Sequence, residues 1–510
     1  MESCARRAGV LACLLLPAVA RAQLAPVGVP GGSVRIELDG SIETWDHRFL
    51  DGRRDALGAD LSSDALGGDL IPLVGEADAR LARITGLSTI RLDLGKLTTD
   101  AFADEGRGYL GLSLGLSDAI TIFGRLPVVR TRVQVAASVD AASTNAGLNP
   151  GETSHAAFFQ ELDTALGTLG SRLAAGDYDG DPSQKALAQA TLASGTALRN
   201  DLFGLLSDPA TASPFVPTAT SPGGTAVTST ITSLQGTLSG SLGISGFTLT
   251  PELPATPVSG AEVLALLGDP AVGVRLGETK ITFRGDAEAG VALTLADHWD
   301  RGGRRGGFRT AVEGLARFPT GRRARTDRAL ALGTGEGSTD IEARITTDLG
   351  TGRWGTRLEG GYRRRLAADV LARVAPPTQP FPGLDLLSVV RRDPGDVGTI
   401  GARPFYRLAR SLAIVGSVQY WSRKADRYSY TTPADSIPDV DPNVLALDTE
   451  ATATVLGIGL SYSNLGRRTG GRGMPVDAGW SYERVVSTTG GRVADRHTVR
   501  ARFRVYFGLF

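Results

Sequence analysis

Cysteine is scarce in this sequence, and its position removes it from the mature protein. The 510 residues contain two cysteines, Cys4 and Cys13. Both lie in residues 1–22, which have basic residues near the start, an apolar stretch over residues 8–20 and a small-x-small ending. These features are typical of a secretory signal peptide, which we expect to be cleaved before Gln23. The mature chain would then have no thiol for a disulfide or a thiolate metal site.

Long apolar runs and an excess of one charge are also absent. The apolar part of the signal is too short to span a bilayer as a helix, and no later stretch offers about 18 uninterrupted apolar residues. The chain has 54 basic and 54 acidic residues, and removal of the signal leaves a net charge of −2, which excludes a protein that coats nucleic acid. With 42% hydrophobic residues and 66 glycines, a membrane protein must have alternate residues that face water.

Such alternation is present. In residues 340–349, the odd positions are apolar or Thr, and most even positions are charged. After a short turn at 350–353, residues 354–365 alternate again, with Leu358 next to Arg357. A period of two residues indicates β-strands with one apolar and one polar face.

The same alternation recurs along the chain. Further segments lie at 109–117, 119–136, 286–295, 308–318, 396–408, 411–424, 448–463, 476–488 and 495–510, with weaker candidates at 34–46 and 88–98. Strands of soluble β-sandwiches usually have about 5 to 6 residues, whereas tilted membrane strands need about 9 to 11. The segment lengths therefore favour a transmembrane barrel over a soluble sandwich.

The links between these segments alternate in length. Short links lie at 117–119, 350–353 and 408–411, and long polar links lie at 137–280, 320–336, 367–395 and 425–447. Short periplasmic turns and long extracellular loops are typical of an outer-membrane barrel. We predict an all-β, transmembrane, antiparallel up-and-down barrel. About 13 strands are counted, and bacterial single-chain barrels have even numbers, so we expect 14 strands, with 12 as the alternative.

The chain divides into five parts on this interpretation. They are the signal peptide (1–22), an N-terminal segment with a candidate plug and the first strands (23–106), a barrel hairpin (107–136), an extracellular insertion with a helical hairpin (137–280) and the main barrel strands (281–510). The candidate plug is the stretch from Ile71 to Ile84, which has helical spacing. The Thr-, Ser- and Gly-rich stretch 221–250 is expected to be loop or a β-extension.

The insertion has apolar residues at helical spacing. Those of its first helix are Phe158, Leu162, Leu166, Leu169 and Leu173. A second run follows a break at residues 176–182, so we expect a helical hairpin. It is interpreted as a cap on the barrel mouth, or alternatively as a gate inside the lumen.

Charged residues on the polar faces of the strands are candidates for lining the lumen. They are Glu288, Glu313, Arg317, Glu342, Arg344, Arg357, Glu359, Arg363, Arg365, Arg500, Arg502 and Arg504. A charge on the lipid side would cost about 2 to 4 kcal/mol near the midplane, so these side chains should point inward. They either satisfy one another in a filled lumen or set the selectivity of a polar pore.

No enzyme or metal site is predicted. The sequence has four histidines, and neither His298 nor His497 has a recognisable nucleophile nearby. Residues 177–181 faintly resemble a calcium loop, but Pro182 and Ala188 stand where Gly and Glu are required, so a solvated turn is expected. We expect no catalytic residues, no metal and no cofactor.

Two stretches resemble a known group of proteins. Residues 109–127, YLGLSLGLSDAITIFGRLP, are similar to the YGLTDxLTLxxxLP hairpin of outer-membrane proteins related to phenol meta-pathway degradation. Residues 285–290 and 317–321 resemble the GDxExG and RxPTG strand pair of the same group. These proteins are broadly similar to FadL-type transporters, and the resemblance implies uptake of fatty or aromatic molecules. The terminal Phe510 resembles an assembly signal, although it falls on the arginine parity of the last strand.

Pattern and resemblance together predict an outer-membrane channel or transporter of a Gram-negative bacterium for small, hydrophobic or aromatic molecules. The alternative is a structural or adhesive barrel with a filled lumen and functional outer loops. Expected partners are outer-membrane lipid and lipopolysaccharide, the barrel assembly machinery and the solute, without nucleic acid.

Overall fold

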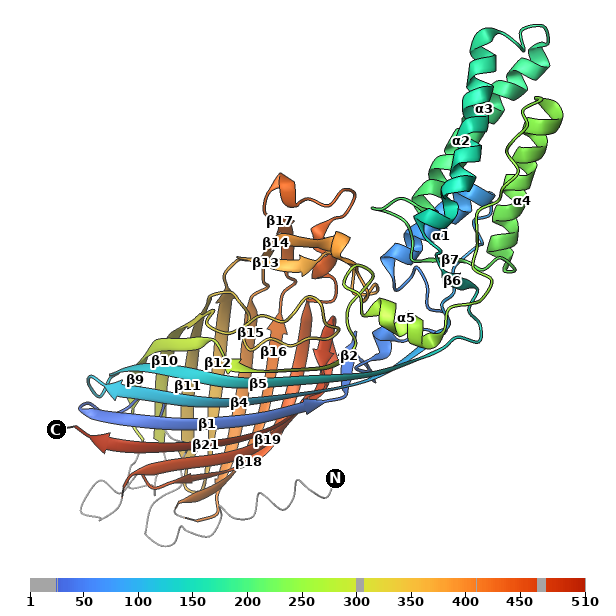
Figure 1. Ribbon diagram of the computed structural model, residues 1–510. Helices are drawn as coiled ribbons and strands as arrows, with labels where there is room; N and C mark the ends of the chain where they lie inside the picture. The colour runs from blue at the N-terminus through green and yellow to red at the C-terminus, as the bar shows by residue number, and fades with distance from the viewer. Residues whose placement is uncertain (1–23, 25, 300–306, 410, 466–473, 510) are drawn as a thin grey trace.

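The computed structural model describes residues 24, 26–299, 307–409, 411–465 and 474–509. The expected signal peptide and Phe510 lie outside these residues. The described chain forms a barrel of antiparallel strands and a group of helices beyond one of its ends (Figure 1).

Twelve strands form the closed barrel, each paired with its neighbours in chain order. They are β1 (Ser33–Trp45), β4 (Lys96–Gly115), β5 (Ile120–Asp140), β9 (Ala287–Asp297), β10 (Gly307–Phe318), β11 (Asp340–Thr351), β12 (Trp354–Arg365), β15 (Val397–Arg407), β16 (Leu412–Arg423), β18 (Ala451–Ser463), β19 (Val476–Thr489) and β21 (His497–Gly508). Pairing of β1 with β21 closes the ring. A further strand, β8 (Gly277–Arg284), pairs with β5 beyond the point where β9 begins.

The predicted antiparallel barrel is confirmed, but the preferred strand number of 14 is wrong and the alternative of 12 is correct. The surplus candidate is the segment 88–98, of which only the residues from Lys96 onward belong to a strand. Leu92 and Leu94 alternate with polar residues because they are buried in the core of the helical part. Alternation alone did not distinguish this irregular packed segment from a strand.

The outward face of the barrel is apolar. Leu38, Val128 and Ile400 are 54%, 54% and 64% exposed, respectively. Exposed aromatic side chains lie towards both ends of this band: Phe308, Trp354 and Phe507 at one end, and Phe318, Tyr362 and Tyr420 at the other. An apolar band between two aromatic girdles, around a polar interior, is the architecture of an outer-membrane type β-barrel.

The two ends of the barrel differ in their connections. At one end, β4 and β5 are joined through residues 116–119, and β11 and β12 through 352–353. At the other end, residues 141–276 connect β5 to β8, and residues 46–95 connect β1 to β4. We call these the short-turn end and the long-loop end. Since transmembrane barrels have short periplasmic turns, the short-turn end corresponds to the periplasmic side.

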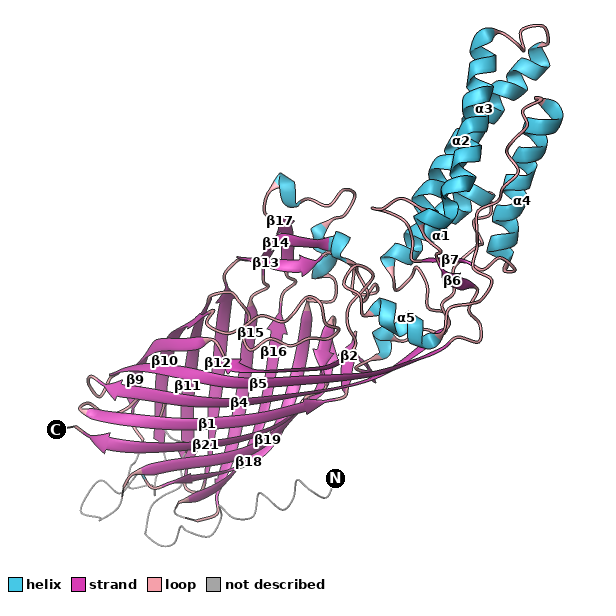
Figure 2. Cartoon of the chain, viewed as in Figure 1, coloured by secondary structure: helices cyan, strands magenta, loops and turns pink. Residues whose placement is uncertain are grey.

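The helical part lies at the long-loop end, reached by the extended β4–β5 hairpin (Figure 2). Its helices are α1 (Pro72–Thr85), α2 (Glu152–Ala175), α3 (Pro182–Leu206), α4 (Pro222–Gly236) and α5 (Gly260–Leu267), with the short strands β6 (Ala146–Leu148) and β7 (Phe215–Pro217). Their apolar faces share one buried core. Two smaller sheets accompany the loops: β13 (Ala368–Arg373) with β14 (Leu387–Asp393) and β17 (Arg427–Tyr430), and β2 (His47–Leu50) with β3 (Arg53–Ala56) and β20 (Arg492–Ala494).

The predicted helical hairpin is present as α2 and α3, and the turn between them ends at Asp181, whose carboxylate caps α3. The prediction of loop or β-structure for 221–250 is wrong for its first half, because α4 occupies it. Val227, Ile231 and Leu234 of α4 are buried at helical spacing. Within the described residues, no helix has the length and apolarity needed to cross a bilayer.

Candidate functional site

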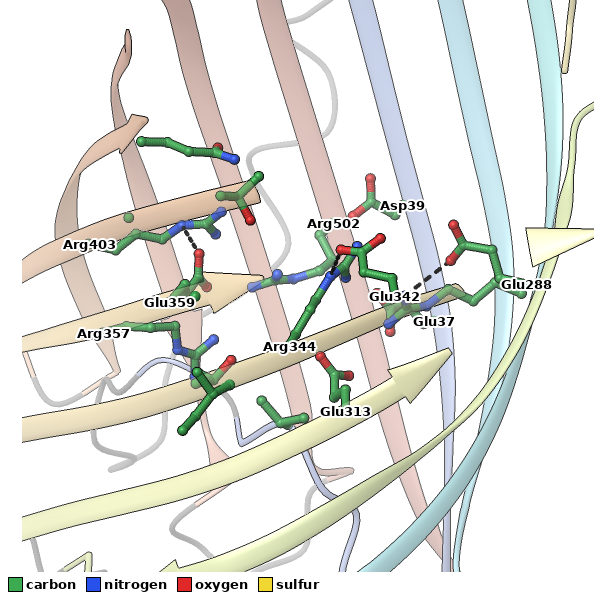
Figure 3. Close-up of a pocket in the computed structure, with 18 of the residues that line it drawn as sticks. Glu37, Asp39, Glu288, Glu313, Glu342, Arg344, Arg357, Glu359, Arg403 and Arg502 are labelled. Carbon is green, nitrogen blue, oxygen red and sulfur yellow. Dashed lines mark hydrogen bonds and ion pairs between the residues drawn. The ribbon is translucent and has the colours of Figure 1, made fainter. Parts of the chain in front are cut away.

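The inward faces of the strands surround a cavity of about 400 Å³ in the barrel (Figure 3). Among the described residues that line it are ten arginines and seven carboxylates. They are Arg35, Arg125, Arg317, Arg344, Arg357, Arg363, Arg403, Arg500, Arg502 and Arg504, with Glu37, Asp39, Glu288, Glu313, Glu342, Glu359 and Glu483. The lumen is therefore strongly polar, with cations in excess on its lining.

Strand alternation explains why these charges face inward. On β1, Arg35 and Glu37 are buried, whereas Ile36 and Leu38 between and beyond them are 39% and 54% exposed on the outward face. A register slip of one residue would exchange the two faces. The pairing of β1 with both β4 and β21 is continuous, so the inward set is fixed over the whole strand.

Glu342 is the centre of one ion-pair network. It accepts from Arg344 and lies 2.9 Å from Arg317 and 3.2 Å from Arg363. Arg317 also donates to Glu288 at 2.6 Å, and Glu288 lies 3.4 Å from Arg125. The network spans five strands, so it ties this side of the wall together from within.

A second group lies nearer the short-turn end. Asp348 accepts from both Arg309 and Arg357, at 3.0 Å and 2.7 Å from their Nε atoms. On the opposite wall, Arg504 donates to Glu37 at 3.0 Å. These carboxylates are at most 5% exposed, so their partners compensate most of the cost of burying them.

Some lining charges remain without such a partner. Arg500, Asp39, Glu313 and Glu483 line the cavity and form no ion pair with another described residue. Charges of both signs are thus available to water or a solute in the lumen.

A segment that belongs to no strand crosses the lumen at its short-turn side. Arg35 donates to the carbonyl oxygens of Pro26 and Val27, at 3.3 Å and 3.0 Å. The backbone N–H of Val29 donates to Thr121 Oγ1 at 2.8 Å. Arg309 Nη2 donates to the carbonyl of Leu24 at 3.0 Å. The described residues from 24 to 30 are therefore held by side chains of the wall. We call residues 24 and 26–30 the crossing segment.

The apolar side chains of the crossing segment are anchored on separate walls. Leu24 packs with Phe405 of β15 and Ala413 of β16. Val27 packs against Leu315 of β10, together with residues of β5 and β9. Because β11 and β12 separate these two groups of strands, the segment runs across the barrel interior and not along one wall.

A second cavity, of about 460 Å³, lies on the other side of the crossing segment. Pro26 lines both cavities, and Val29 and Pro30 line the second one. Apolar and aromatic residues are prominent in this lining, including Val29, Trp299 and Tyr506. The crossing segment therefore separates a charged cavity from a more apolar one at the short-turn end.

The charged residues predicted to line the lumen fall almost entirely in one place. All of them except Arg365 line the 400 Å³ cavity. Arg365 is buried at the long-loop end of β12, where it lies 2.9 Å from Glu336 of the loop after β10. Whether these residues act on a solute stays a prediction.

The residues predicted as a gate or cap lie elsewhere. Phe158, Leu162, Leu166 and Leu169 are buried in the core of the helical part, and Leu173 packs against it. None of the described residues that line the charged cavity belongs to a helix. Likewise α1, the candidate plug, contacts α3 and α4. The crossing segment, and not these helices, occupies the lumen.

Several lining residues were missing from the sequence prediction. Arg35, Glu37 and Asp39 of β1 share the inward parity, and Arg125 and Arg403 follow the same rule on their strands. Alternation was sufficient to find them. The crossing segment has no periodicity, so no sequence pattern indicated that it enters the lumen.

The histidines make local contacts. His155 is buried, with Nε2 2.9 Å from the carbonyl of Glu252. His497 Nδ1 lies 2.7 Å from the hydroxyl of Tyr482. Over the described ranges, no group of three or more His, Cys, Asp or Glu is arranged to hold a metal ion.

No protein-family model and no curated protein matches the sequence. Among solved structures, an outer-membrane channel from Pseudomonas putida F1 is similar with 10% identity and a TM-score of 0.43, over 95% of this chain and all of the other. A FadL homologue from Pseudomonas aeruginosa has 8% identity and a TM-score of 0.28, over 94% and 91% of the two chains. The toluene transporter TodX of Pseudomonas putida has 10% identity and a TM-score of 0.25, over 94% and 90%. The likeness is one of general outline, and the 12-stranded barrel is established by the strand pairing of the chain itself.

Proposed function

We propose that this chain is an outer-membrane channel for small molecules, and that the crossing segment closes it in the state described. The observation that carries the proposal is the pair of cavities, of about 400 and 460 Å³, on the two sides of that segment. A barrel with a purely structural role does not require a cavity on each side of a segment that crosses its lumen. Displacement of the crossing segment would join the two spaces into one route.

The manner in which the crossing segment is held supports this role. It is held by side-chain hydrogen bonds, two apolar anchors and a local backbone hydrogen bond from Ser33 to Pro30, whereas the wall strands are held by long ladders of antiparallel backbone pairing. A neutral side-chain bond contributes roughly 0.5 to 1.5 kcal/mol net and one donated by an arginine about 1.5 to 3 kcal/mol, so release of these few bonds costs less than opening the strand ladders of the wall.

We further propose that the solutes are small hydrophobic or aromatic molecules. The apolar lining of the second cavity, with Trp299, Val29 and Pro30, favours such a solute on the short-turn side. The similarity of residues 109–127 to a hairpin of hydrophobic-uptake proteins implies the same class. Transport would involve no chemical step and no cofactor. Outer-membrane lipid, lipopolysaccharide and the barrel assembly machinery complete the proposed set of partners.

Conductance in planar bilayers tests the channel. The full-length chain should show small or flickering currents, and a variant lacking residues 24–30 should conduct several-fold more because the barrier is removed. A point variant that combines Leu24→Gly with Val27→Gly removes both anchors without shortening the chain and should fall between the two. Leu447→Gly, at an exposed loop position, is the matched control and should behave like the parent.

Liposome uptake tests the solute class. The deletion variant should admit toluene-sized aromatic molecules faster than the parent does, relative to empty liposomes. If the deletion variant folds but neither conducts nor admits solute, the chain is a structural barrel and the proposal fails.

A further inference from the structure

Basic side chains gather on the outward face of the barrel at one place, next to the end of the apolar band. On β5, the outward positions Leu126 and Val128 are 50% and 54% exposed, and the next two outward positions are Arg130 and Arg132. The neighbouring strand β8 presents Lys280 and Arg284 on the same face. We call Arg130, Arg132, Lys280 and Arg284 the outward basic patch.

The register places these cations together. Arg132 pairs directly with Lys280, and Arg284 stands opposite Val128. Like charges directly opposite each other on adjacent strands are destabilising. The sequence nevertheless places two such cations face to face, with Arg130 between them and Arg284. An external anion would relieve this repulsion.

Nearby carboxylates neutralise only part of the patch. Arg132 lies 3.2 Å from Asp104 and 3.9 Å from Glu278. Arg284 donates to the backbone carbonyl of Thr320 at 3.0 Å. Arg130 and Lys280 are exposed, and neither forms an ion pair with another described residue.

Other outward cations at this end of the barrel form ion pairs with carboxylates. Arg364 of β12 lies 3.1 Å from Asp396, and Arg484 of β19 lies 3.2 Å from Asp495. Each of these has a carboxylate partner, which Arg484 shares with Arg54. The surplus of positive charge is therefore a property of the β5–β8 surface and not of the whole rim.

The height of the patch matches that of lipid headgroups. Arg130 and Arg132 follow the last exposed large apolar residue of β5, Val128, by two and four positions, which corresponds to roughly 7 and 13 Å along the strand. The polar headgroup layer extends about 5 to 8 Å beyond each side of the hydrocarbon core, and a tilted strand rises more slowly than its own length. Because the patch lies at the long-loop end, this layer is that of the outer leaflet.

We infer that the outward basic patch binds the phosphate groups of lipopolysaccharide in the outer leaflet. The inference goes beyond the proposed channel function and rests on the placement of the barrel in an outer membrane. The patch supplies at least two uncompensated cations beside an apolar surface, which is the arrangement that an acylated, phosphorylated lipid requires. Its acyl chains would lie on Leu126 and Val128, and its phosphates on Arg130 and Lys280.

Binding of purified lipid A to the full-length chain, refolded in detergent micelles, tests the inference. The variant combining Arg130→Gln with Lys280→Gln removes the two cations that have no intramolecular partner, so the fold should be kept. We expect its affinity for bisphosphorylated lipid A to fall at least about ten-fold. The parent should lose affinity as salt is raised, because the attraction is screened. The control combining Arg364→Gln with Arg484→Gln removes two outward cations that have partners, and it should change the affinity less than about two-fold.

Three results would overturn the inference: unchanged affinity in the Arg130→Gln, Lys280→Gln variant, equal binding of dephosphorylated lipid A, or competition by millimolar inorganic phosphate, which would indicate a site for free phosphate. Heat-modified migration of the barrel in gels verifies that each variant is folded. Neither residue lines the lumen, so conductance of this variant should equal that of the parent, and failure of lipid binding stays distinguishable from failure of the channel proposal.

Discussion

The barrel and the helical part of this chain arrange the same residue types in opposite ways. In the barrel, Trp354 and Ile400 are each 64% exposed on the outside, while Asp348 is 2% exposed inside. In the helical part, Leu162 is fully buried, and Asp163 beside it pairs with Arg199 at the surface. The inversion occurs within one chain because the two parts face different surroundings.

The difference shows which force stabilises each part. The helices bury apolar surface away from water, so their stability comes mainly from a packed core. The barrel wall faces hydrocarbon outside, so its apolar side chains need no protein partners there. Its interior is held by strand pairing and by the networks around Glu342 and Asp348. Burial inside this barrel therefore concerns charges, whose partners decide whether the arrangement is stable.

The largest expected difference between the two parts is the loss of stability when a buried lumen carboxylate is removed. Asp348→Ala takes away the carboxylate shared by Arg309 and Arg357, and we expect unfolding in lipid vesicles to become easier by about 3 to 5 kcal/mol. The matched change in the helical part, Asp163→Ala, breaks an exposed pair with Arg199 and should cost roughly 0 to 1 kcal/mol. Urea titrations followed by tryptophan fluorescence measure the first variant. Equal effects of the two changes would contradict the comparison.

Truncation of one leucine in each part compares the loss of stability in a packed protein core with the loss on a surface that faces lipid. Leu162→Ala leaves a cavity in the helical core and should cost about 2 to 5 kcal/mol locally. Leu358→Ala, at a 43% exposed outward position of β12, leaves space that lipid chains fill, so only a transfer term of about 1 to 2 kcal/mol is expected. Hydrogen exchange of α2 and α3 reports the first change, and urea unfolding of the barrel reports the second. A larger loss for Leu358→Ala would show that its outward face packs on protein.

The smallest expected effect concerns the N-terminal cap of a helix, an interaction that the barrel strands do not have. Asp181 caps α3 by accepting from the backbone N–H groups of Ser183 and Gln184, at 2.9 Å and 3.2 Å. Asp181→Ala should weaken protection of the first turn of α3 by about 1 kcal/mol in hydrogen exchange, and Asp181→Ser should restore most of it. Barrel unfolding should be unaffected by either change. A matching shift of the barrel transition would mean that the two parts unfold together.

Much of the fold was predictable because lipid and water impose a period of two on each strand. The segments at 340–349 and 354–365 became β11 and β12 with almost the predicted bounds. The error at 88–98 arose because Leu92 and Leu94 alternate for a different reason, namely one-sided burial under helices. Helix α4 was missed because its serines and threonines suggested a loop. In the structure, hydroxyls such as that of Thr228 donate to the carbonyl four residues earlier, so they fit within the helix.

The inward charges were also predictable, since charge is costly in hydrocarbon, but their partners were not. The carboxylate of Glu342 forms ion pairs with arginines of its own strand, of β10 and of β12. Only the register of these three strands brings the four side chains together. The residues of α2 that were interpreted as a cap, or alternatively as a gate, show the opposite case. Their helical spacing predicted a buried face correctly, but spacing does not identify what covers that face.

The sequence by itself determined which residues face lipid and which face the interior, because the alternation along each strand is local and its period is set by backbone geometry. Only the tertiary structure decided how many strands close the ring, which arginine pairs with which carboxylate, and that the crossing segment enters the lumen. These features depend on contacts between residues far apart in the chain, and such contacts leave no period in the sequence.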